Sequence, residues 1–113
     1  MKFLIVEDNL QMRRLIAQIV GKSSDIVFEC EDGAEALTAY RAHRPDWVLM
    51  DIEMPDTDGI SATRQIIAAF PAAKIAIVTD HDNPNLREAA AQAGACEYIV
   101  KENLIDLRRL FAH

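Results

Sequence analysis

The chain has 113 residues, of which 50% are hydrophobic and 27% are charged, and its formal net charge is −6. This length suits one domain with a single core, and the negative charge argues against nonspecific binding to nucleic acid or to an anionic membrane. No apolar run approaches the roughly 18 residues of a membrane span, and residues 1–3 do not begin a signal peptide. We therefore expect a cytoplasmic protein with reduced cysteines.

The N-terminal residues predict a strand followed by a helix. Residues 2–6 form a short apolar run that ends in Glu7-Asp8, and Asn9 can cap the helix that follows. The apolar positions of this helix recur at helical spacing and predict one buried face: Met12, Leu15, Ile16, Ile19 and Val20. Gly21 can end the helix.

A second strand and helix follow. Residues 26–30 read as a strand, and Asp32 and Glu35 have the spacing of a capping box. The helix that they begin runs to about His43, because Pro45 blocks its continuation.

The third strand is predicted at residues 46–50 and ends abruptly in Asp51. Pro55 and Gly59 indicate that the residues after it form a loop. The next helix has an inner face made by Ile60, Thr63, Ile67 and Phe70. Pro71 closes this helix.

The fourth strand is predicted at residues 74–79. Asn83 is a cap for the following helix and Pro84 occupies its first position. The helix continues through the alanine-rich residues 86–93, and Gly94 is its stop signal.

Residues 96–100 predict a fifth strand, which ends in Lys101, and residues 103–111 predict a last helix. The inward positions of this helix are Leu104, Leu107 and Phe111. Apolar strands that alternate with helices indicate a parallel sheet with helices on both faces, an α/β/α three-layer domain. Periodicity does not give the order of the strands.

Polar residues end four of the five strands. Glu7-Asp8, Asp51, Thr79 and Lys101 would meet at one edge of a parallel sheet if the first and third strands are neighbours. Clustered carboxylates stay ionised only beside cations, which Lys101 and Mg²⁺ can supply. The metal, the Thr79 hydroxyl and the Lys101 ammonium suit the oxygens of a phosphoryl group, and Asp51 can be the nucleophile that forms an aspartyl phosphate.

This ordered set of residues resembles the receiver domain of two-component response regulators, over essentially the whole chain (1–113). The motifs that carry the resemblance are Glu7-Asp8, Asp51 with Met54-Pro55 and Asp58-Gly59, Thr79, Gly94-Ala95, Tyr98 and Lys101. The segment from Gly94 to Lys101 is most similar to the nitrate and nodulation regulators, which usually carry a helix-turn-helix output domain. The resemblance implies a flavodoxin-like (βα)5 fold with the strand order 2-1-3-4-5.

The resemblance also implies a role for each acidic residue. Asp51 would accept a phosphoryl group from the phosphohistidine of a sensor histidine kinase or from a small phosphodonor. Asp8 and Asp51 would bind Mg²⁺ directly, together with the backbone carbonyl of Glu53, and Glu7 would bind it through water. Lys101 would pair with Asp51 and then with the phosphoryl group.

Two further residues would form the switch. Thr79 would move toward the phosphoryl oxygen and Tyr98 would turn inward, which reshapes the face made by residues 86–111. The result is a change in partner, homodimer or output-domain contacts, so we expect a signalling protein and not an enzyme. DNA would be contacted only through an output domain absent from this chain, and both a stand-alone receiver and a piece of a longer transcription regulator remain open.

Two positions depart from the family pattern. Asp80 follows the threonine, where a small residue is usual. We expect its carboxylate to repel the phosphodonor and slow phosphorylation, to contribute to holding the metal, or to point into solvent. Glu102 follows Lys101, where proline is usual and the bond is often cis. Because a cis bond before a residue other than proline costs roughly 3 kcal/mol, the conformation of this bond is left open.

The implied strand order separates the two cysteines. Cys30 and Cys96 would lie on opposite edge strands, roughly 19 Å apart at about 4.8 Å per strand. A disulfide needs Cα atoms within about 7 Å, so we predict two free thiols.

Two other classes of function are compatible with this fold. A phosphate-independent interaction module on the same fold is favoured by Asp80 and Glu102. A phosphatase with an aspartyl nucleophile is a third class, since Glu53 resembles its second acid, but 113 residues leave little room for a cap domain. His81 lies near the site and is expected either to influence hydrolysis of the phosphate or to be an ordinary loop residue.

Overall fold

Five parallel strands form one sheet in the computed structural model, which describes residues 1–22 and 24–111. The strands are β1 (Lys2–Val6), β2 (Ile26–Cys30), β3 (Trp47–Met50), β4 (Ile75–Thr79) and β5 (Glu97–Val100). Their order is β2-β1-β3-β4-β5, and all four pairings are parallel. The predicted flavodoxin-like strand order is confirmed.

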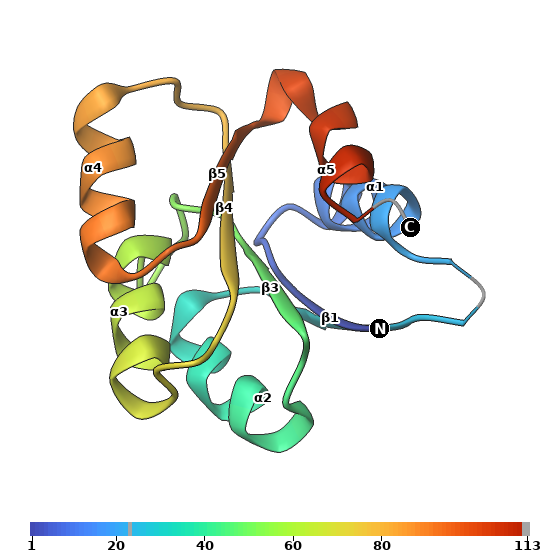
Figure 1. The fold of residues 1–113 in the computed structure, drawn as a ribbon, viewed down its shortest axis with the longest axis horizontal. Helices are drawn as coiled ribbons and strands as arrows, with labels where there is room; N and C mark the ends of the chain where they lie inside the picture. Colours follow the sequence, from blue (N-terminus) through green and yellow to red (C-terminus); the bar gives the residue numbers. More distant parts are fainter. Residues whose placement is uncertain (23, 112–113) are drawn as a thin grey trace.

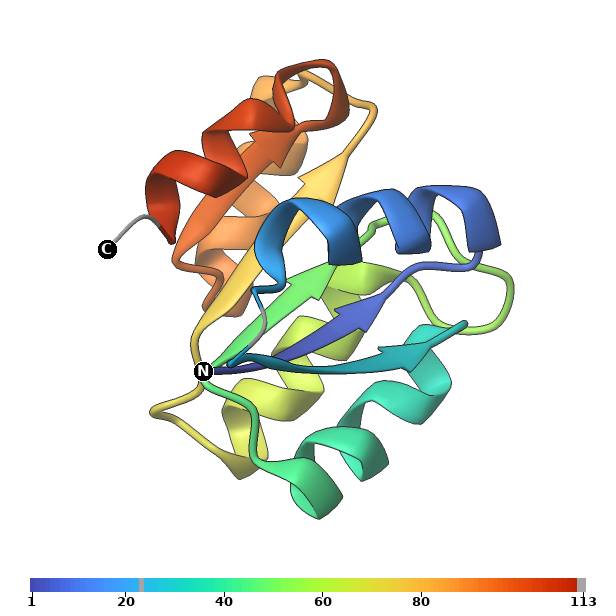
Figure 2. The same ribbon diagram turned by 90° about the vertical axis from the view of Figure 1, so that its right-hand side faces the viewer.

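Five helices cover the two faces of the sheet. They are α1 (Leu10–Val20), α2 (Ala36–His43), α3 (Gly59–Ala69), α4 (Pro84–Ala93) and α5 (Ile105–Leu110), with short 3₁₀ turns at Gly33–Glu35 and Lys101–Asn103. Helices α1 and α5 lie on one face, and α2, α3 and α4 lie on the other (Figures 1 and 2). This arrangement is the predicted α/β/α three-layer domain.

The sheet separates two hydrophobic cores. Alternate residues of β1 belong to different cores: Leu4 and Val6 pack toward α2 and α3, whereas Phe3 and Ile5 pack toward α1 and α5. Because both faces are covered, every residue of β4 is buried and the strand has no polar face. The ring centroids of Phe111 and Phe3 lie 4.9 Å apart in an edge-on contact, which holds the end of α5 against the sheet.

The buried face of α1 differs from the prediction. Leu15 is 42% exposed, whereas Arg13, Ile16 and Val20 are buried. The three buried residues recur at spacings of three and four, and they place an arginine on the side of the helix that faces the sheet.

The predicted capping box before α2 forms only in part. The Asp32 side chain accepts a hydrogen bond from the Ala34 N–H, and the Glu35 side chain makes no return bond to the cap. A 3₁₀ turn therefore comes between the cap and α2. The helix then ends at His43, as predicted, and Arg44 adopts a left-handed conformation (φ 47°) before Pro45.

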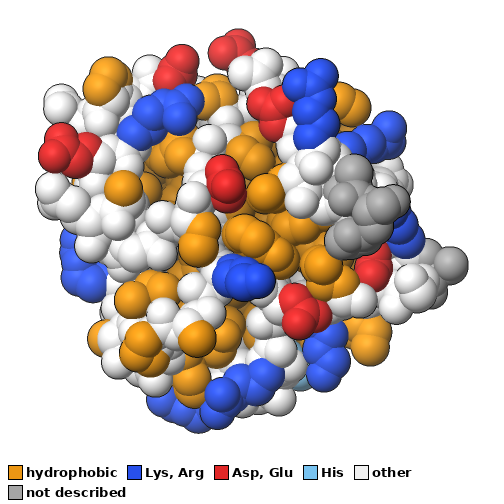
Figure 3. Space-filling model, in the orientation of Figure 1, with side chains coloured by type: hydrophobic (Ala, Val, Ile, Leu, Met, Phe, Trp, Pro, Cys, Tyr) orange, Lys and Arg blue, Asp and Glu red, His pale blue; other side chains and the backbone are white. Residues whose placement is uncertain are grey.

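The surface carries charges of both signs. On the face seen in Figure 3, Lys and Arg side chains lie among Asp, Glu and apolar side chains and do not form one basic block. None of the helices within residues 1–22 and 24–111 combines the length and the apolarity that crossing a bilayer requires.

Candidate functional site

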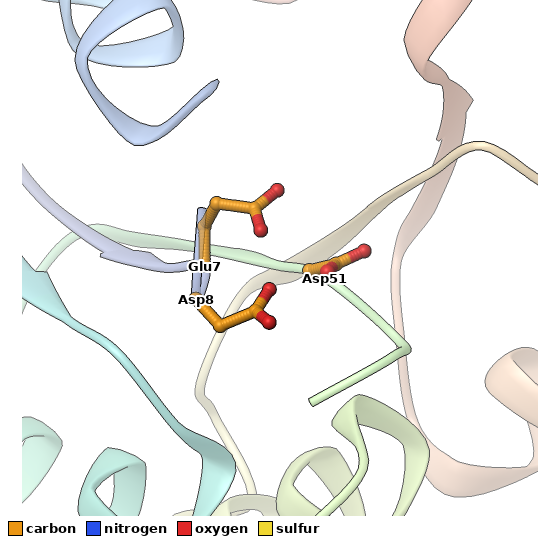
Figure 4. Close-up of side chains that lie close together, drawn as sticks. All are labelled: Glu7, Asp8 and Asp51. Carbon is orange, nitrogen blue, oxygen red and sulfur yellow. The ribbon is translucent and has the colours of Figure 1, made fainter. Parts of the chain in front are cut away.

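Three carboxylates meet where β1 and β3 end. Val6 of β1 lies opposite Met50 of β3, so the residues that follow the two strands leave the sheet side by side. Glu7, Asp8 and Asp51 each offer a carboxylate oxygen, and these oxygens lie within 4.8 Å of one another. Figure 4 shows the three side chains together just beyond the strand ends. The predicted convergence of the acidic residues is confirmed.

The acidic cluster lies in a cavity with a volume of about 770 Å³. Its lining is polar at the strand ends and apolar toward α1 and the β3–α3 loop. The lining residues that bear on the chemistry are Glu7, Asp8, Asp51, Thr79, Asp80, His81 and Lys101, and the apolar ones are Met12, Leu15, Met54 and Pro55. The cavity therefore brings together every strand-end residue that the sequence singled out.

The Lys101 ammonium lies between two buried acids. Its Nζ is 2.6 Å from Oε1 of Glu7 and 3.4 Å from Oδ1 of Asp51. The expected pairing with Asp51 is present, but Glu7 is the nearer partner. Burial lowers the pKa of Lys101, but the bond to Glu7 and the charges of Asp51 and Glu7 outweigh this effect, so its pKa is raised and it stays cationic.

Asp51 is 6% exposed, and its surroundings disfavour the ionised form of its carboxyl group. Burial, followed by the negative charge of Glu7, raises its pKa from 3.8 to about 7, although Lys101 acts in the opposite direction. One ammonium is therefore too little positive charge for three neighbouring acids. Oxygen donors at this spacing, with Asp8 exposed to water, fit a hard divalent cation that keeps part of its hydration shell, such as Mg²⁺.

Thr79 and Tyr98 are connected through the backbone of His81. The Thr79 hydroxyl is buried at the end of β4 and accepts a hydrogen bond from the His81 N–H at 3.3 Å. The Tyr98 hydroxyl donates to the His81 carbonyl at 2.7 Å, and its ring lies under the guanidinium of Arg87 at 4.6 Å. The loop after β4 is thus tied to β5.

The side chain of His81 closes one side of the cavity. Its Nε2 lies 2.5 Å from Oε1 of Glu53, which joins the loop after β4 to the loop after β3. No sequence pattern predicts this contact, because the two residues are 28 positions apart and neither side chain is buried. For the metal site, the family resemblance implies a role for the backbone carbonyl of Glu53 and none for its side chain.

A model of the family described as "Response regulator receiver domain" matches residues 3–112. The chain belongs to this family. A chemotaxis protein CheY from Bacillus subtilis is 40% identical over 101 residues, which are 88% of this chain and 84% of the relative. The transcriptional regulatory protein PdtaR from Mycobacterium tuberculosis is 39% identical over 88% of this chain and 49% of its own length. The chain is thus a receiver domain and not a classical enzyme.

Solved structures of receiver domains have the same fold. A LuxR-family two-component response regulator from Aurantimonas sp. has a TM-score of 0.90 and 32% identity, over 96% of this chain and 79% of that one. The signal receiver domain of a response regulator NarL from Mycobacterium tuberculosis has a TM-score of 0.82 and 26% identity, over 93% and 90% of the two chains. Relatives of both the CheY and the LuxR/NarL types are therefore similar to this receiver domain.

The two departures from the family pattern are visible in the site. Asp80 is exposed and lines the cavity, and its charge contributes to raising the pKa of Lys101. No peptide bond within residues 1–22 and 24–111 is cis, so Lys101 and Glu102 are joined by a trans bond. The backbone enters a 3₁₀ turn at Lys101, and the ammonium still reaches both acids.

Two buried residues of this receiver domain were missed by the sequence analysis. Arg13 donates to the Glu7 carbonyl at 2.8 Å, and Asp32 accepts from the N–H groups of Asp56 and Thr57 at 2.9 and 3.1 Å. Arg13 could have been found, because it shares a helical stripe with Ile16 and Val20. The second role of Asp32 has no sequence signal, since its partners lie 24 and 25 residues away.

Proposed function

We propose that this receiver domain is a phosphorylation-dependent signalling switch in which Asp51 accepts a phosphoryl group. The donor is the phosphohistidine of a sensor histidine kinase or a small phosphodonor. The observation that carries the proposal is the cluster of three carboxylate oxygens within 4.8 Å, with the Lys101 ammonium beside Asp51. A carboxylate that opens into a cavity beside a cation can act as a nucleophile toward phosphorus.

The acidic residues suit the roles that the family resemblance implies. Asp8 and Asp51 would bind Mg²⁺ directly, with the backbone carbonyl of Glu53 as a further oxygen donor. Glu7 would act through water, and its carboxylate also pairs with the Lys101 ammonium at 2.6 Å. When it is bound, Mg²⁺ neutralises the acids and draws electron density from the phosphoryl oxygens.

Lys101 and Thr79 stabilise the product of the transfer. Phosphorylation moves negative charge from the Asp51 carboxylate onto the phosphoryl oxygens. The Lys101 ammonium is 3.4 Å from Asp51 and can follow this charge with a small movement. The Thr79 hydroxyl lies at the end of the neighbouring strand and can donate to another oxygen.

Tyr98 carries the change to the surface. Its hydroxyl bond to the His81 carbonyl connects β5 with the loop that follows Thr79, so a displacement of Thr79 changes the position of both. The surface that responds is made by α4, β5 and α5. We propose this surface as the contact for a partner, a second copy of the chain or an output domain.

The wider setting is proposed on the family alone. Residues 1–113 form one receiver domain of a cytoplasmic two-component system. Regulation of transcription, as in the nitrate and nodulation regulators, requires an output domain to contact DNA. Similarity to CheY proteins and to LuxR/NarL-type regulators supports both a stand-alone receiver and a longer regulator.

A phosphate-independent interaction module is the second candidate function. It is favoured by Asp80, which adds a further acid to the cavity that a negatively charged phosphodonor has to enter. Such a module needs neither Mg²⁺ binding nor a reactive Asp51.

The test is the intact mass of the protein after incubation with Mg²⁺ and acetyl phosphate or phosphoramidate. We expect a gain of about 80 Da, one phosphoryl group, in the wild type and none in Asp51→Asn. Asp56→Asn is the matched control, because Asp56 is an exposed acid of the same loop, and this variant is expected to gain the group. No adduct in any of the three proteins, together with no Mg²⁺ binding, would establish the interaction module instead.

A further inference from the structure

Arg13 is the one buried arginine among the described residues, with 7% of its surface exposed. Its guanidinium makes hydrogen bonds in two directions. Nη1 donates to the Glu7 carbonyl at 2.8 Å, and Nε donates to Oε1 of Glu29 on β2 at 2.8 Å. Nη2 also lies 3.9 Å from Oε1 of Glu31. A buried cation is tolerated only when such partners compensate for its lost hydration.

The backbone around Asp8 is anchored to Arg13 at both ends. The Glu7 carbonyl belongs to the planar peptide group that leads into Asp8, so a bond to this oxygen fixes the orientation of that plane. On the other side of Asp8, the Asn9 carbonyl accepts a hydrogen bond from the Arg13 backbone N–H at 2.9 Å. The N–H of Glu7 is bonded to the Cys30 carbonyl of β2 at 3.0 Å, which completes the anchoring of this turn.

We infer that Arg13 is a positioning residue for the metal site, which fixes the backbone of Glu7 and thereby the direction of the Asp8 carboxylate. The inference rests on the proposed function, because it assigns the support of the same Mg²⁺ site. Arg13 acts through the Glu7 carbonyl and contacts neither the metal nor the phosphoryl group. Its bond to Glu29 holds the guanidinium in place and connects the site to the edge strand β2.

The geometry requires arginine at this position. A planar guanidinium donates from Nη1 and Nε along fixed directions, toward Glu7 and Glu29 at the same time. A lysine ammonium has the same charge, but it is a single point that cannot reproduce both bonds. Arg13→Lys therefore keeps the electrostatic field of the site and removes only the two-directional anchoring.

Charge and positioning predict opposite effects on metal affinity. Arg13 is a cation close to an acidic cluster, so its positive charge by itself opposes Mg²⁺ binding. If charge were its only influence, Arg13→Gln would tighten Mg²⁺ binding. If it positions the site, both Arg13→Gln and Arg13→Lys weaken binding.

The experiment is titration calorimetry of Mg²⁺ into the wild type, Arg13→Lys and Arg14→Lys, without any phosphodonor. Arg14 is exposed on the same helix and makes no hydrogen bond or ion pair among the described residues, so Arg14→Lys is the matched control. We expect Arg13→Lys to weaken Mg²⁺ binding about tenfold, the lower end of the loss typical for residues that support metal ligands. Arg14→Lys is expected to bind within twofold of the wild type.

A second variant keeps the inference testable if Arg13→Lys does not fold. Glu29 is a half-exposed residue outside the metal cluster, and Glu29→Gln releases the guanidinium from β2. We expect a loss of severalfold in Mg²⁺ affinity, and no further loss when Glu29→Gln is added to Arg13→Lys, because both changes remove the same support.

The outcomes separate this inference from the proposed function. The inference is overturned if Arg13→Lys and Glu29→Gln bind Mg²⁺ as tightly as the wild type does. Reduced stability of these variants in urea would then show that Arg13 is only a structural link between α1 and β2. If the wild type itself binds no Mg²⁺, the metal site of the proposed function is overturned, and the inference falls with it.

Discussion

The buried carboxyl group of Asp51 has a cost in stability at neutral pH. In the metal-free protein its carboxyl group is buried beside Glu7, and its pKa is raised to about 7. A raised pKa means that the folded state binds a proton more tightly than the unfolded state does. The free energy of unfolding therefore falls as the pH rises from about 3.8 to about 7, because the folded protein must bury a charge.

Replacing Asp51 by asparagine should remove this cost. In EDTA we expect Asp51→Asn to be more stable than the wild type at pH 8. Its advantage should be about 3 kcal/mol smaller at pH 5, two pH units below the folded pKa of about 7, at about 1.4 kcal/mol per unit. Urea unfolding of both proteins at the two pH values measures the difference. A difference in stability that does not change with pH would show that the pKa of Asp51 is not raised.

Asp80 offers a second prediction at the scale of one residue. Its exposed carboxylate lines the cavity and repels an anionic phosphodonor, so Asp80→Ala should be phosphorylated about threefold faster by acetyl phosphate at low salt. The gain should shrink at higher salt, because ions screen exposed charges. The rate of formation of the mass adduct measures the effect.

Glu97→Ala is the control for Asp80→Ala. Glu97 is also exposed but begins β5, at the opposite end of the strand from the site. This variant changes the net charge by the same amount and should leave the rate unchanged. If Asp80→Ala is no faster than Glu97→Ala, the Asp80 side chain is an ordinary surface group.

At the scale of elements, the loop after β3 is held by a residue that follows β2. Asp32 accepts hydrogen bonds from the N–H groups of Ala34, Asp56 and Thr57, which lower its pKa although burial raises it. One carboxylate thus caps the turn before α2 and also hydrogen-bonds the loop that leads from Asp51 to α3. This loop also supplies the Glu53 carbonyl to the proposed metal site.

Removing the Asp32 carboxylate should lower the stability of the protein more than removing an ordinary helix cap does. We expect Asp32→Ala to lower the free energy of unfolding by about 2 to 3 kcal/mol at pH 7, since three backbone donors lose a charged acceptor. Asp58→Ala, which removes the cap of α3 and its two bonds to Ser61, should cost about 1 kcal/mol. Urea unfolding compares the two, and equal losses would show that the bonds to Asp56 and Thr57 contribute little.

At the scale of the whole molecule, the strand order decides which side chains can meet. Because β1 lies between β2 and β3, Glu7-Asp8 come next to Asp51. Because β4 lies between β3 and β5, the strand end that carries Thr79 lies between the strand ends that lead to Asp51 and Lys101. The same order leaves Cys30 and Cys96 at opposite edges of the sheet. Both are free thiols, as predicted, with Cys30 buried and Cys96 exposed.

The two thiols should therefore react at different rates. In the native protein we expect one fast reaction, at Cys96, and a much slower one at Cys30, because burial and the charge of Glu35 raise the pKa of Cys30 to about 11 and its sulfur is shielded. Titration with a thiol reagent before and after unfolding should count one fast thiol and then two. Cys96→Ser should abolish the fast reaction, and two fast thiols in the native wild type would contradict the burial of Cys30.

The sequence by itself determined the layers of this protein and the positions of its acidic residues along the chain. The strands are mostly apolar runs, and four of the five end in a polar residue, so the local pattern shows both where a strand lies and where it leaves the core. Such patterns depend on residues only a few positions apart. For this reason the strand at residues 26–30, the end of α2 at His43 and the cap of α4 at Asn83 were predicted correctly.

Only the tertiary structure decided which groups pair. The nearer partner of Lys101 is Glu7, Arg13 is buried while Leu15 is exposed, and His81 contacts Glu53. Each of these outcomes depends on which elements lie next to one another and on the direction in which long side chains can reach. Periodicity describes the exposure of one helix or strand on average, whereas a charged side chain is placed by the partners that other elements bring to it.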